Sequence, residues 1–417
     1  MIFLFIWLVL LLEGCAFFTL EKELTELEQV HVLTGTIINR TQPNKSVLII
    51  LYEKTKDGQR VSQTNILNSE LGLFVVEAQN GIYYLLAFED LNNNLSYDEN
   101  EPLGFYGNPS PIAISDKTPK AWYGFDISLN ASNGFPEGFP NDISLSPDIL
   151  RGSFVKMGQV INFDDPILSQ KYGNKGYWEP LTFIREVGFC LIFKEKYDAR
   201  KTPVLFVHGA RGTPLGWENS INHLDLDRFQ PWFYYYPSGL PLDKVSYALN
   251  QMVMALHRHY NFKELYVVAH SMGGLVARSF ILQNCYESRQ NFIKLFVSIS
   301  TPWNGHRMSA KGVQQAPIAV PSWYDMVPDS AFIKSLFERR LPDFLKYYLF
   351  FSYKGDCSLF LANNDGTVEL SSELDLRAQA GAERLYGYEE DHRSILNTEV
   401  VLSQISRLIS QHKNLSL

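Results

Sequence analysis

Residues 263–280 read "KELYVVAHSMGGLVARSF", and this stretch decides the fold of the C-terminal half of the chain. Its first part is almost continuously apolar, which is typical of a strand buried on both faces of a sheet. Its second part has the spacing of an amphipathic helix. Similar apolar runs alternate with helical patterns along the rest of this half, at residues 203–209, 231–239, 291–301 and 347–356. We therefore predict an α/β fold with a doubly wound, mostly parallel sheet covered by helices on both faces.

Ser271 lies where this strand passes into this helix. A tight turn lifts a side chain above the edge of the sheet, and the helix N-terminus offers free N–H groups to negative charge. Gly273 avoids crowding in the turn, and Gly274 lets the helix approach the sheet. The usual pattern around such a nucleophile is G-x-S-x-G, whereas this chain has Ala269 in the first position. Ser271 is a candidate nucleophile, and the alternative is an ordinary small residue at a strand–helix turn.

A serine hydroxyl is a weak nucleophile without a base, and in this type of fold the base follows the serine along the chain. His392, in "EEDHRSIL", precedes the last predicted helix on a loop that can fold back over Ser271. His306 follows a predicted strand and is the competitor, whereas His412 lies within the closing helix. We predict His392 as the base.

An acid that orients the base should lie between the serine and the histidine in the chain. Asp365, in the turn "NNDGTVEL", has this position. Asp356 and Asp391 are rivals. Asp391 adjoins His392, and the side chains of neighbouring residues usually point apart. We therefore predict Asp365.

Two backbone N–H groups should stabilise the negative charge that develops on a carbonyl oxygen during attack. Met272, directly after the serine, supplies one, and Ala210 in the loop "VHGARG" supplies the other. We expect His208 to orient this loop rather than to transfer protons. His270 is expected to be a packing or loop residue.

The motifs "VLFVHGARGTPLGW", "AHSMGGLVAR", "STPWNG", "NNDGTVEL" and "DHRSIL" together resemble an α/β-hydrolase of the lipase/esterase kind, similar to the bacterial triacylglycerol-lipase and PGAP-like group. The resemblance implies Ser271 as nucleophile, Asp365 as acid and His392 as base, with Ala210 and Met272 as the oxyanion hole. It does not fix the substrate.

The resemblance extends over residues 158–417 and includes an apolar insertion at about 302–348, where hydrolases carry a cap or lid. Its side chains could line an acyl pocket, or form a small helical subdomain with its own core. We expect a carboxylic ester with an apolar acyl group, such as a lipid, and no metal or organic cofactor. The alternatives are a non-catalytic cell-envelope binding protein and an acyltransferase or amidase with the same triad.

Length and charge limit the remaining possibilities. A chain of 417 residues suggests about two or three domains. Hydrophobic residues make up 46% of the sequence, enough for a sizeable core, and the net charge of −8 argues against a nucleic-acid partner.

The N-terminal run Ile2–Leu12 is apolar but shorter than the roughly 20 residues that span a bilayer, so it suits the core of a signal peptide. It ends in "LEGC", which resembles the bacterial lipobox with Cys15 as the lipidated residue. Glu13 and the lack of a preceding Lys or Arg depart from that pattern, and an uncleaved anchor or an ordinary secretory signal is the alternative. We predict a signal peptide at 1–15, a helical tether at 16–30, and a lipid-anchored protein of the bacterial cell envelope, at the outer membrane or facing the periplasm.

Residues 31–129 contain short runs rich in Val, Ile, Tyr and Phe at hairpin-like spacing, which predict a small antiparallel β-sandwich. The order of these runs is similar to carboxypeptidase-regulatory or transthyretin-like domains, and its partner is left open. Residues 130–157 are rich in Pro, Gly, Asn and Ser and are predicted to be a linker.

One loop of this β-domain, "DLNNNLSYDENEP", has oxygen-bearing side chains at the spacing of an EF-hand calcium loop: Asp90, Asn92, Asn94, Asp98 and Glu101. Leu95 occupies the position where that loop has Gly. A structural Ca²⁺ is one interpretation, and a solvated Asx-rich loop is the other.

Overall fold

The computed structural model describes residues 2–42, 44–56, 58–67, 71–131, 135, 139, 143–145, 150–152, 155–355 and 363–415. Backbone contacts divide the chain into two compact units. One unit comprises Lys22–Met157 and Ile184–Gly188, and the other comprises Met1–Glu21, Gly158–Phe183 and Phe189–Leu417.

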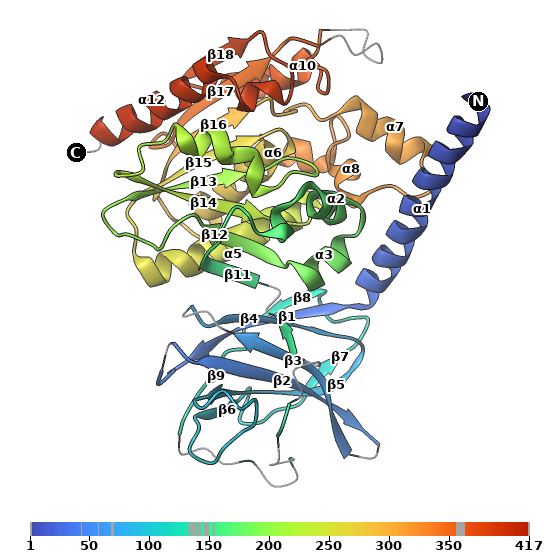
Figure 1. The fold of residues 1–417 in the computed structure, drawn as a ribbon, viewed down its shortest axis with the longest axis vertical. Coiled ribbons are helices and arrows are strands. Elements are labelled where there is room, and N and C mark those ends of the chain that lie inside the picture. The colour runs from blue at the N-terminus through green and yellow to red at the C-terminus, as the bar shows by residue number, and fades with distance from the viewer. Residues whose placement is uncertain are drawn as a thin grey trace. The chain divides into compact units, whose positions relative to one another are not determined.

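The second unit is built on one large sheet. Its strands are β11 (Val155–Val160), β12 (Phe189–Phe193), β13 (Thr202–Val207), β14 (Phe229–Tyr235), β15 (Leu265–His270), β16 (Ile293–Ile299), β17 (Lys346–Ser352) and β18 (Arg384–Tyr388). They form an eight-stranded sheet in the order β11-β12-β14-β13-β15-β16-β17-β18 (Figure 1). β12 runs antiparallel to β14, and the pairings from β14 through β18 are parallel. The predicted doubly wound, mostly parallel sheet is confirmed.

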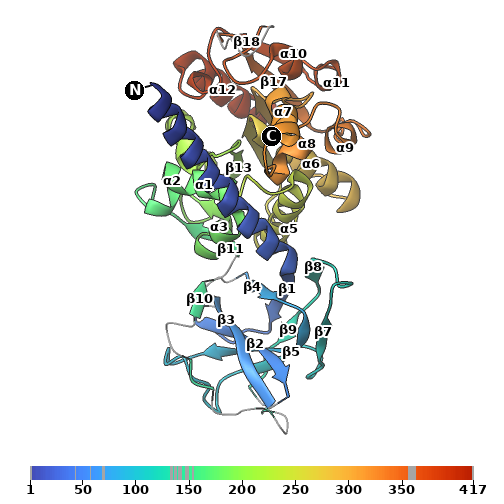
Figure 2. The same ribbon diagram turned by 90° about the vertical axis from the view of Figure 1, so that its right-hand side faces the viewer.

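The central strands are apolar because both of their faces are covered. Every residue of β13 and of β15 is buried, as expected for a parallel sheet between two helical layers. Figure 2 shows α12 (Glu399–Leu415) on one side of the strands and α5 (Leu242–Tyr260) and α6 (Met272–Leu282) on the other. α5 buries one stripe of residues that includes Val245, Leu249, Met252 and Leu256, and ends at Asn261 in a left-handed conformation.

The other helices of this part of the chain are short, and most lie at the ends of the strands. They are α2 (Gln170–Trp178), α3 (Pro180–Glu186), α4 (Glu218–Asn222), α7 (Arg307–Gln315), α8 (Pro321–Asp325), α9 (Ala331–Ser335), α10 (Leu370–Glu373) and α11 (Leu376–Gln379).

The predicted insertion at 302–348 contains α7, α8 and α9. Several of its apolar side chains are buried, among them Trp303, Ile333 and Leu336, whereas others such as Tyr324 and Phe344 are exposed. Much of its apolar content therefore serves packing, in line with the subdomain alternative.

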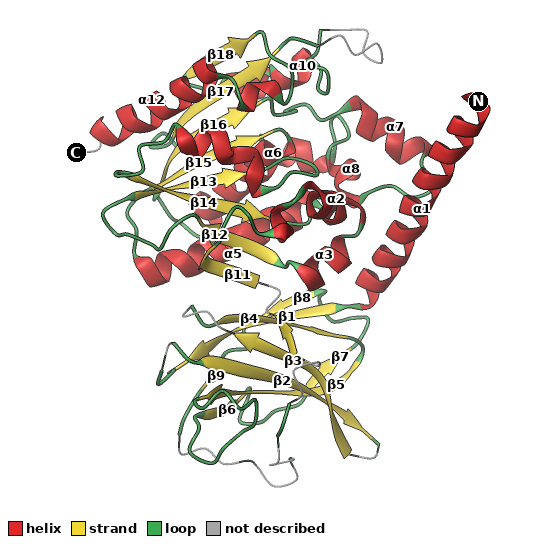
Figure 3. Cartoon of the chain, viewed as in Figure 1, coloured by secondary structure: helices red, strands yellow, loops and turns green. Residues whose placement is uncertain are grey.

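The first unit contains two sheets, drawn in yellow in the lower part of Figure 3. Its strands are β1 (His31–Ile38), β2 (Ser46–Thr55), β3 (Gly58–Leu67), β4 (Leu73–Ala78), β5 (Gly81–Asp90), β6 (Leu103–Phe105), β7 (Ile112–Ile114), β8 (Ala121–Tyr123), β9 (Ile127–Ser128) and β10 (Leu150–Gly152). One sheet has the order β4-β1-β8, with β9 on β1, and the other has the order β10-β3-β2-β5-β6, with β7 on β5. Leu33 and Phe74 from the first sheet share a core with Ile49 and Leu85 from the second, so the sheets pack face to face.

Two features of this unit differ from the sequence-based expectation. β8 and β9 pair with β1 in parallel, and β10 pairs with β3 in parallel, so the unit is not purely antiparallel. The segment 130–157, predicted as a linker, contributes β10 to a sheet and buries Ile143 and Leu145 in a second core cluster. Short strands that join a sheet edge far from their neighbours in the chain leave little periodic signal in a sequence.

The loop Asp90–Glu101 is closed by its own hydrogen bonds. Asp90 accepts the backbone N–H groups of Asn94 and Leu95 at 3.0 Å each, and Leu95 takes a φ of 60°, the conformation for which the calcium pattern has Gly. The Asn94 amide donates to Asp98 at 2.9 Å. Among the described residues, no three or more His, Cys, Asp or Glu side chains are grouped so that they could hold a metal ion. Calcium binding by this loop stays a prediction.

The N-terminal helix α1 (Ile2–Gln29) includes the predicted tether. Within the part of the chain that the structure describes, no helix combines the length and the apolar character needed to cross a membrane. The backbone of Cys15 lies in this helix.

Two glycines set how closely α6 approaches the sheet. A Cβ on Gly273 would collide with the carbonyl oxygens of Val207 and His208, and a Cβ on Gly274 would overlap the Thr301 side chain. Thr301 is buried, so it has little room to move. Both glycines are therefore needed for the packing at the start of α6, as the sequence predicts.

We expect Gly274→Ala to lower the free energy of unfolding by about 1–3 kcal/mol, because the added methyl overfills a packed contact. Urea denaturation measures the change. Gly216→Ala is the matched control, since nothing lies within 4 Å of the Cβ it would add. Thr301→Ala in the Gly274→Ala background should recover part of the loss. Equal effects of the two glycine substitutions would contradict this account.

Candidate functional site

The backbone at Ser271 is held in a sharp turn. Its φ of 54° and ψ of −133° are rare for a residue with a side chain. The Ser271 N–H donates to the Ile299 carbonyl at 2.8 Å, and its own carbonyl accepts the Gly274 N–H at 2.9 Å. The strand before the serine and the helix after it thus impose the conformation and lift the side chain out of the sheet.

The structure brings the three predicted triad residues together. The Ser271 hydroxyl lies 2.8 Å from His392 Nε2, and His392 Nδ1 lies 2.5 Å from Asp365 Oδ2. An ionised carboxylate can only accept, so Nδ1 carries the ring proton. Nε2 is then free to accept the proton of the serine hydroxyl, which is the arrangement of a general base.

Asp365 is fully buried and its carboxylate is surrounded by donors. Oδ1 accepts the N–H groups of Thr367 at 2.9 Å and Val368 at 2.6 Å, and Oδ2 accepts the Ser352 hydroxyl at 3.1 Å in addition to His392. Burial alone would raise the pKa of Asp365, but the hydrogen bond and charge of His392 and the two backbone donors lower it to about 2. Asp365 is therefore ionised at neutral pH.

His270 supports the loop that carries His392. Its Nε2 lies 2.8 Å from the His392 carbonyl. Burial, followed by the nearby His392 ring, lowers the pKa of His270 to about 3, so its ring is neutral and Nε2 is the donor. This agrees with the loop role expected for it.

The rival residues have other partners. His306 Nε2 lies 2.6 Å from the Thr367 carbonyl, and His412 packs edge-on against Tyr266 at 5.2 Å. Asp391 accepts the Arg393 and Ser394 N–H groups at 2.8 Å each. Asp356 lies outside the described residues.

Ala210 and Met272, predicted to donate to an oxyanion, belong to two segments that adjoin Ser271. Met272 is the first residue of α6. Ala210 follows Gly209, which approaches Ser271 so closely that a Cβ on it would lie 2.8 Å from Ser271 Cβ. Within the described residues, neither backbone N–H donates a hydrogen bond. Both groups are thus available to a ligand.

His208 ties the oxyanion loop to the next strand. Its Nδ1 lies 2.8 Å from the Gly209 carbonyl, the Tyr236 N–H lies 3.4 Å from its Nε2, and its ring stacks on Tyr236 at 4.3 Å. The Tyr236 hydroxyl donates to the His208 carbonyl at 2.6 Å. Burial lowers the pKa of His208 to about 4, so a neutral ring with both nitrogens engaged fits the expected orienting role.

Three residues behind Asp365 were not foreseen from the sequence: Ser300, Ser352 and Glu373. Ser300 and Ser352 each stand at the C-terminal end of a parallel strand, where ligand-binding and catalytic groups gather in open α/β sheets. That position was the available signal. Glu373 is buried at the end of a one-turn helix, and its sequence context "LSSEL" carries no sign of burial.

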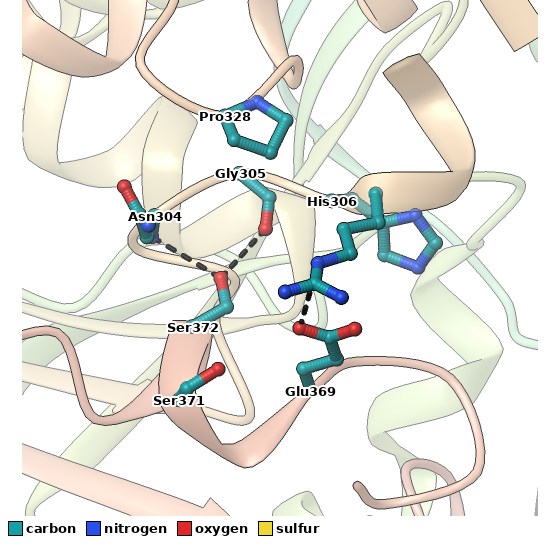
Figure 4. Close-up of a pocket in the computed structure, with 8 residues that line it drawn as sticks. Asn304, Gly305, His306, Pro328, Glu369, Ser371 and Ser372 are labelled. Atoms are coloured by element: carbon teal, nitrogen blue, oxygen red, sulfur yellow. Dashed lines mark hydrogen bonds and ion pairs between the residues drawn. The ribbon is translucent and has the colours of Figure 1, made fainter. Parts of the chain in front are cut away.

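A small cavity lies next to the acid loop. It has a volume of about 140 Å³, and most of the residues that line it lie in α7 and α10 or directly before them, including His306, Arg307, Glu369 and Ser372. Arg307 pairs with Glu369 at 3.2 Å. Figure 4 shows the Ser372 hydroxyl directed at the Gly305 carbonyl, to which it donates at 2.6 Å. None of the three triad residues is among the described residues that line it.

One comparison with known protein families agrees with the fold. Residues 241–373 match the family described as an alpha/beta hydrolase of unknown function (DUF915). The match covers less than half of the chain and includes Ser271 and Asp365. Together with the strand order, it settles the fold. The chain has the α/β-hydrolase fold. No curated protein sequence matches the chain.

Several solved α/β-hydrolase structures are similar at low identity. Lipase BlEst2 of Bacillus licheniformis in its mature form is 18% identical with a TM-score of 0.39, over 52% of this chain and 94% of that one. Aspergillus fumigatus lipase B is 14% identical with a TM-score of 0.39, over 51% of this chain and 54% of that one. Phospholipase PlaB of Legionella pneumophila is 14% identical with a TM-score of 0.36, over 42% and 45%. At these scores the likeness carries no information on the substrate.

The buried neutral histidines predict how stability changes with pH. In the unfolded chain His270 takes up a proton below its ordinary pKa of about 6.5, whereas in the folded protein it does so only near pH 3. Unfolding therefore takes up a proton in this window, and His270 costs about 1.4 kcal/mol of stability per pH unit as the pH falls below 6.5. His270→Gln keeps a hydrogen-bond donor but has no such titration. As the pH falls from 7 to 5, we expect its free energy of unfolding, measured by urea denaturation, to decrease by about 2 kcal/mol less than that of wild type.

His223→Gln is the matched control with the opposite sign. Hydrogen bonds to the Asn219 carbonyl and the Glu399 carboxylate raise the pKa of His223. The stability that His223 contributes is complete below its unfolded pKa and is lost as the pH rises through its folded pKa. His223→Gln should therefore lose more free energy of unfolding than wild type as the pH falls from 7 to 5. If His270→Gln and wild type lose the same free energy of unfolding over this pH range, His270 takes up its proton as readily in the folded protein as in the unfolded chain, which would contradict a buried neutral ring.

Proposed function

We propose that this protein is a serine hydrolase that cleaves carboxylic esters with an apolar acyl group through an acyl-enzyme. One observation carries the proposal. Ser271, held in a strained turn between strand and helix, is hydrogen-bonded to His392, which is hydrogen-bonded to the buried Asp365. A chain of nucleophile, base and acid in this order is the arrangement that activates a serine hydroxyl.

The proposed reaction begins with attack on the ester carbonyl carbon. His392 Nε2 takes the Ser271 proton as the serine oxygen bonds to that carbon, and the N–H groups of Ala210 and Met272 stabilise the oxyanion. The carbon–oxygen bond to the leaving group then breaks, and His392 gives its proton to the departing alcohol. A water molecule then attacks the acyl carbon while His392 takes one of its protons. The bond between that carbon and the Ser271 oxygen breaks, His392 returns the proton to Ser271, and the carboxylic acid is released. Asp365 stabilises the charged imidazole throughout, and these steps require neither a metal nor an organic cofactor.

The preference for an apolar acyl group is the finer part of the proposal. Its support is the apolar insertion between β16 and β17, which precedes the acid loop in the chain. An enzyme anchored at the cell envelope would meet such substrates in the membrane, and the apolar run followed by Cys15 supports an N-terminal lipid anchor.

The first test is labelling of the full chain with a fluorophosphonate, with the modified peptide mapped by mass spectrometry. We expect the adduct on Ser271, and its loss in His392→Ala. On p-nitrophenyl esters of increasing chain length, Ser271→Ala should lower kcat by roughly 10⁴–10⁶-fold. Ser403→Ala, on the exposed side of α12, is the control and should leave kcat unchanged.

The outcomes separate the competing functions. A folded wild type that neither reacts with the probe nor hydrolyses any ester would favour a binding protein. Acyl transfer from the ester to an added alcohol or amine, in excess over hydrolysis, would favour a transferase. A maximum of kcat/KM at the shortest acyl chain would contradict the apolar preference while leaving the hydrolase assignment intact.

The anchor has its own test. Expressed in a bacterium with the lipoprotein pathway, the full chain should incorporate labelled fatty acid and sediment with membranes. Cys15→Ser should abolish the incorporation, because the thiol is the acylated group. Cys285→Ser, at a partly buried free thiol, is the control and should leave the incorporation unchanged. Incorporation that persists in Cys15→Ser would contradict lipidation at this residue.

A further inference from the structure

A second carboxyl group is buried behind Asp365. Glu373, the last residue of α10, is fully buried. Its Oε2 accepts the Ser352 N–H at 3.2 Å. Its Oε1 is buried and has no hydrogen-bond partner among the described residues. A negative charge on Glu373 in such surroundings would be costly, which favours its protonated, neutral form.

Ser352 touches both carboxyl groups. Its hydroxyl donates to Asp365 Oδ2 at 3.1 Å, while its backbone N–H donates to Glu373. The Ser300 hydroxyl lies 2.6 Å from the Ser352 hydroxyl. Since the single hydroxyl proton of Ser352 is directed at the carboxylate, Ser300 has to be the donor in that contact. The hydrogen bonds therefore all have the same direction: Ser300 donates to Ser352, and Ser352 donates to Asp365.

Glu373 is neutral in this arrangement. Burial, followed by the negative charge of Asp365, raises the pKa of Glu373 well above its ordinary value. Two carboxyl groups this close share one charge, and the hydrogen bonds of Asp365 assign that charge to it. The titratable groups that surround the cluster come from the acid loop, the loop after β18, the end of β15 and the segment before α7: Asp365, His392, His270 and His306.

We propose that Glu373 is a positioning residue that works as a neutral acid, holding Ser352 so that its hydroxyl donates to Asp365 Oδ2, the oxygen that also accepts from His392. The inference rests on the proposed function. A neutral Glu373 leaves Asp365 as the single buried negative charge next to His392. A second negative charge there would make the imidazole a stronger base, which would keep it protonated and inactive to higher pH.

Three variants test this: Glu373→Gln, Glu373→Leu and Ser352→Ala, each assayed for kcat, KM and the acid limb of kcat/KM on a p-nitrophenyl ester. Glu373→Gln has the shape and charge of the neutral acid, so its acid limb should coincide with that of wild type. Glu373→Leu and Ser352→Ala should each lower kcat on the order of tenfold to a hundredfold at unchanged KM, because Asp365 loses a fixed partner. The two losses should not add in the double variant, since both act through one contact.

An acid limb that moves down by about one pH unit in Glu373→Gln would mean that Glu373 is charged in wild type, and would overturn the proposal. Wild-type kcat in a folded Glu373→Leu variant would overturn it as well.

A measurement without substrate separates this proposal from the proposed function. The infrared spectrum of the wild-type protein at pH 7 should contain the carbonyl band of a buried protonated carboxylic acid, and Glu373→Gln should lack that band. The band's absence from wild type would refute the neutral acid even if Ser271 is an active nucleophile. Its presence would support the neutral acid even if no ester is hydrolysed.

Discussion

The turn at Ser271 is the constraint on which the rest of the site depends. A residue with a side chain is held there at a φ of 54°, and such a conformation persists where the surrounding packing imposes it. This packing depends on Gly273 and Gly274. Because they lack a side chain, α6 can approach the carbonyls of Val207 and His208 and the side chain of Thr301. A helix that started even slightly further from the sheet would move the serine hydroxyl away from His392. The close packing at the start of α6 thus sets the position of the Ser271 hydroxyl oxygen.

Burial then decides which groups around the serine carry charge. It lowers the pKa of His208 and His270 and raises that of Glu373, so all three become neutral. Asp365 is the exception, because donors on both carboxylate oxygens outweigh the effect of burial. The result is a single fixed negative charge opposite His392. In such a setting a proton moved onto His392 is stabilised by one partner of known position, and the neighbouring rings do not compete for it.

The parts of this arrangement that sequence reasoning reached are those encoded locally. The apolar strands, the Ser271 turn and the order of Asp365 and His392 along the chain follow from short patterns, and in the structure His392 lies within hydrogen-bonding distance of both Ser271 and Asp365. Glu373 and Ser352 could not be reached in the same way, because their importance comes from segments that meet only in the folded protein. The parallel pairing of β10 with β3 was missed for the same reason, since residues 150–152 look like loop until their partner strand is known.

The insertion between β16 and β17 contacts a buried cation on α6. Arg278, buried on α6, donates to the Leu336 carbonyl at 2.7 Å, and its guanidinium lies 4.5 Å from the centre of the Phe337 ring. The guanidinium of Arg377, on α11, lies 4.7 Å from the centre of the same ring. Burial lowers the pKa of Arg278 to about 10, which still leaves it charged at neutral pH. If the Leu336–Phe337 segment moved away, the buried Arg278 guanidinium would lose its hydrogen bond to the Leu336 carbonyl and its contact with the Phe337 ring. Leaving a buried cation without such partners is energetically costly. The Leu336–Phe337 segment therefore connects the insertion to α6 and to α11.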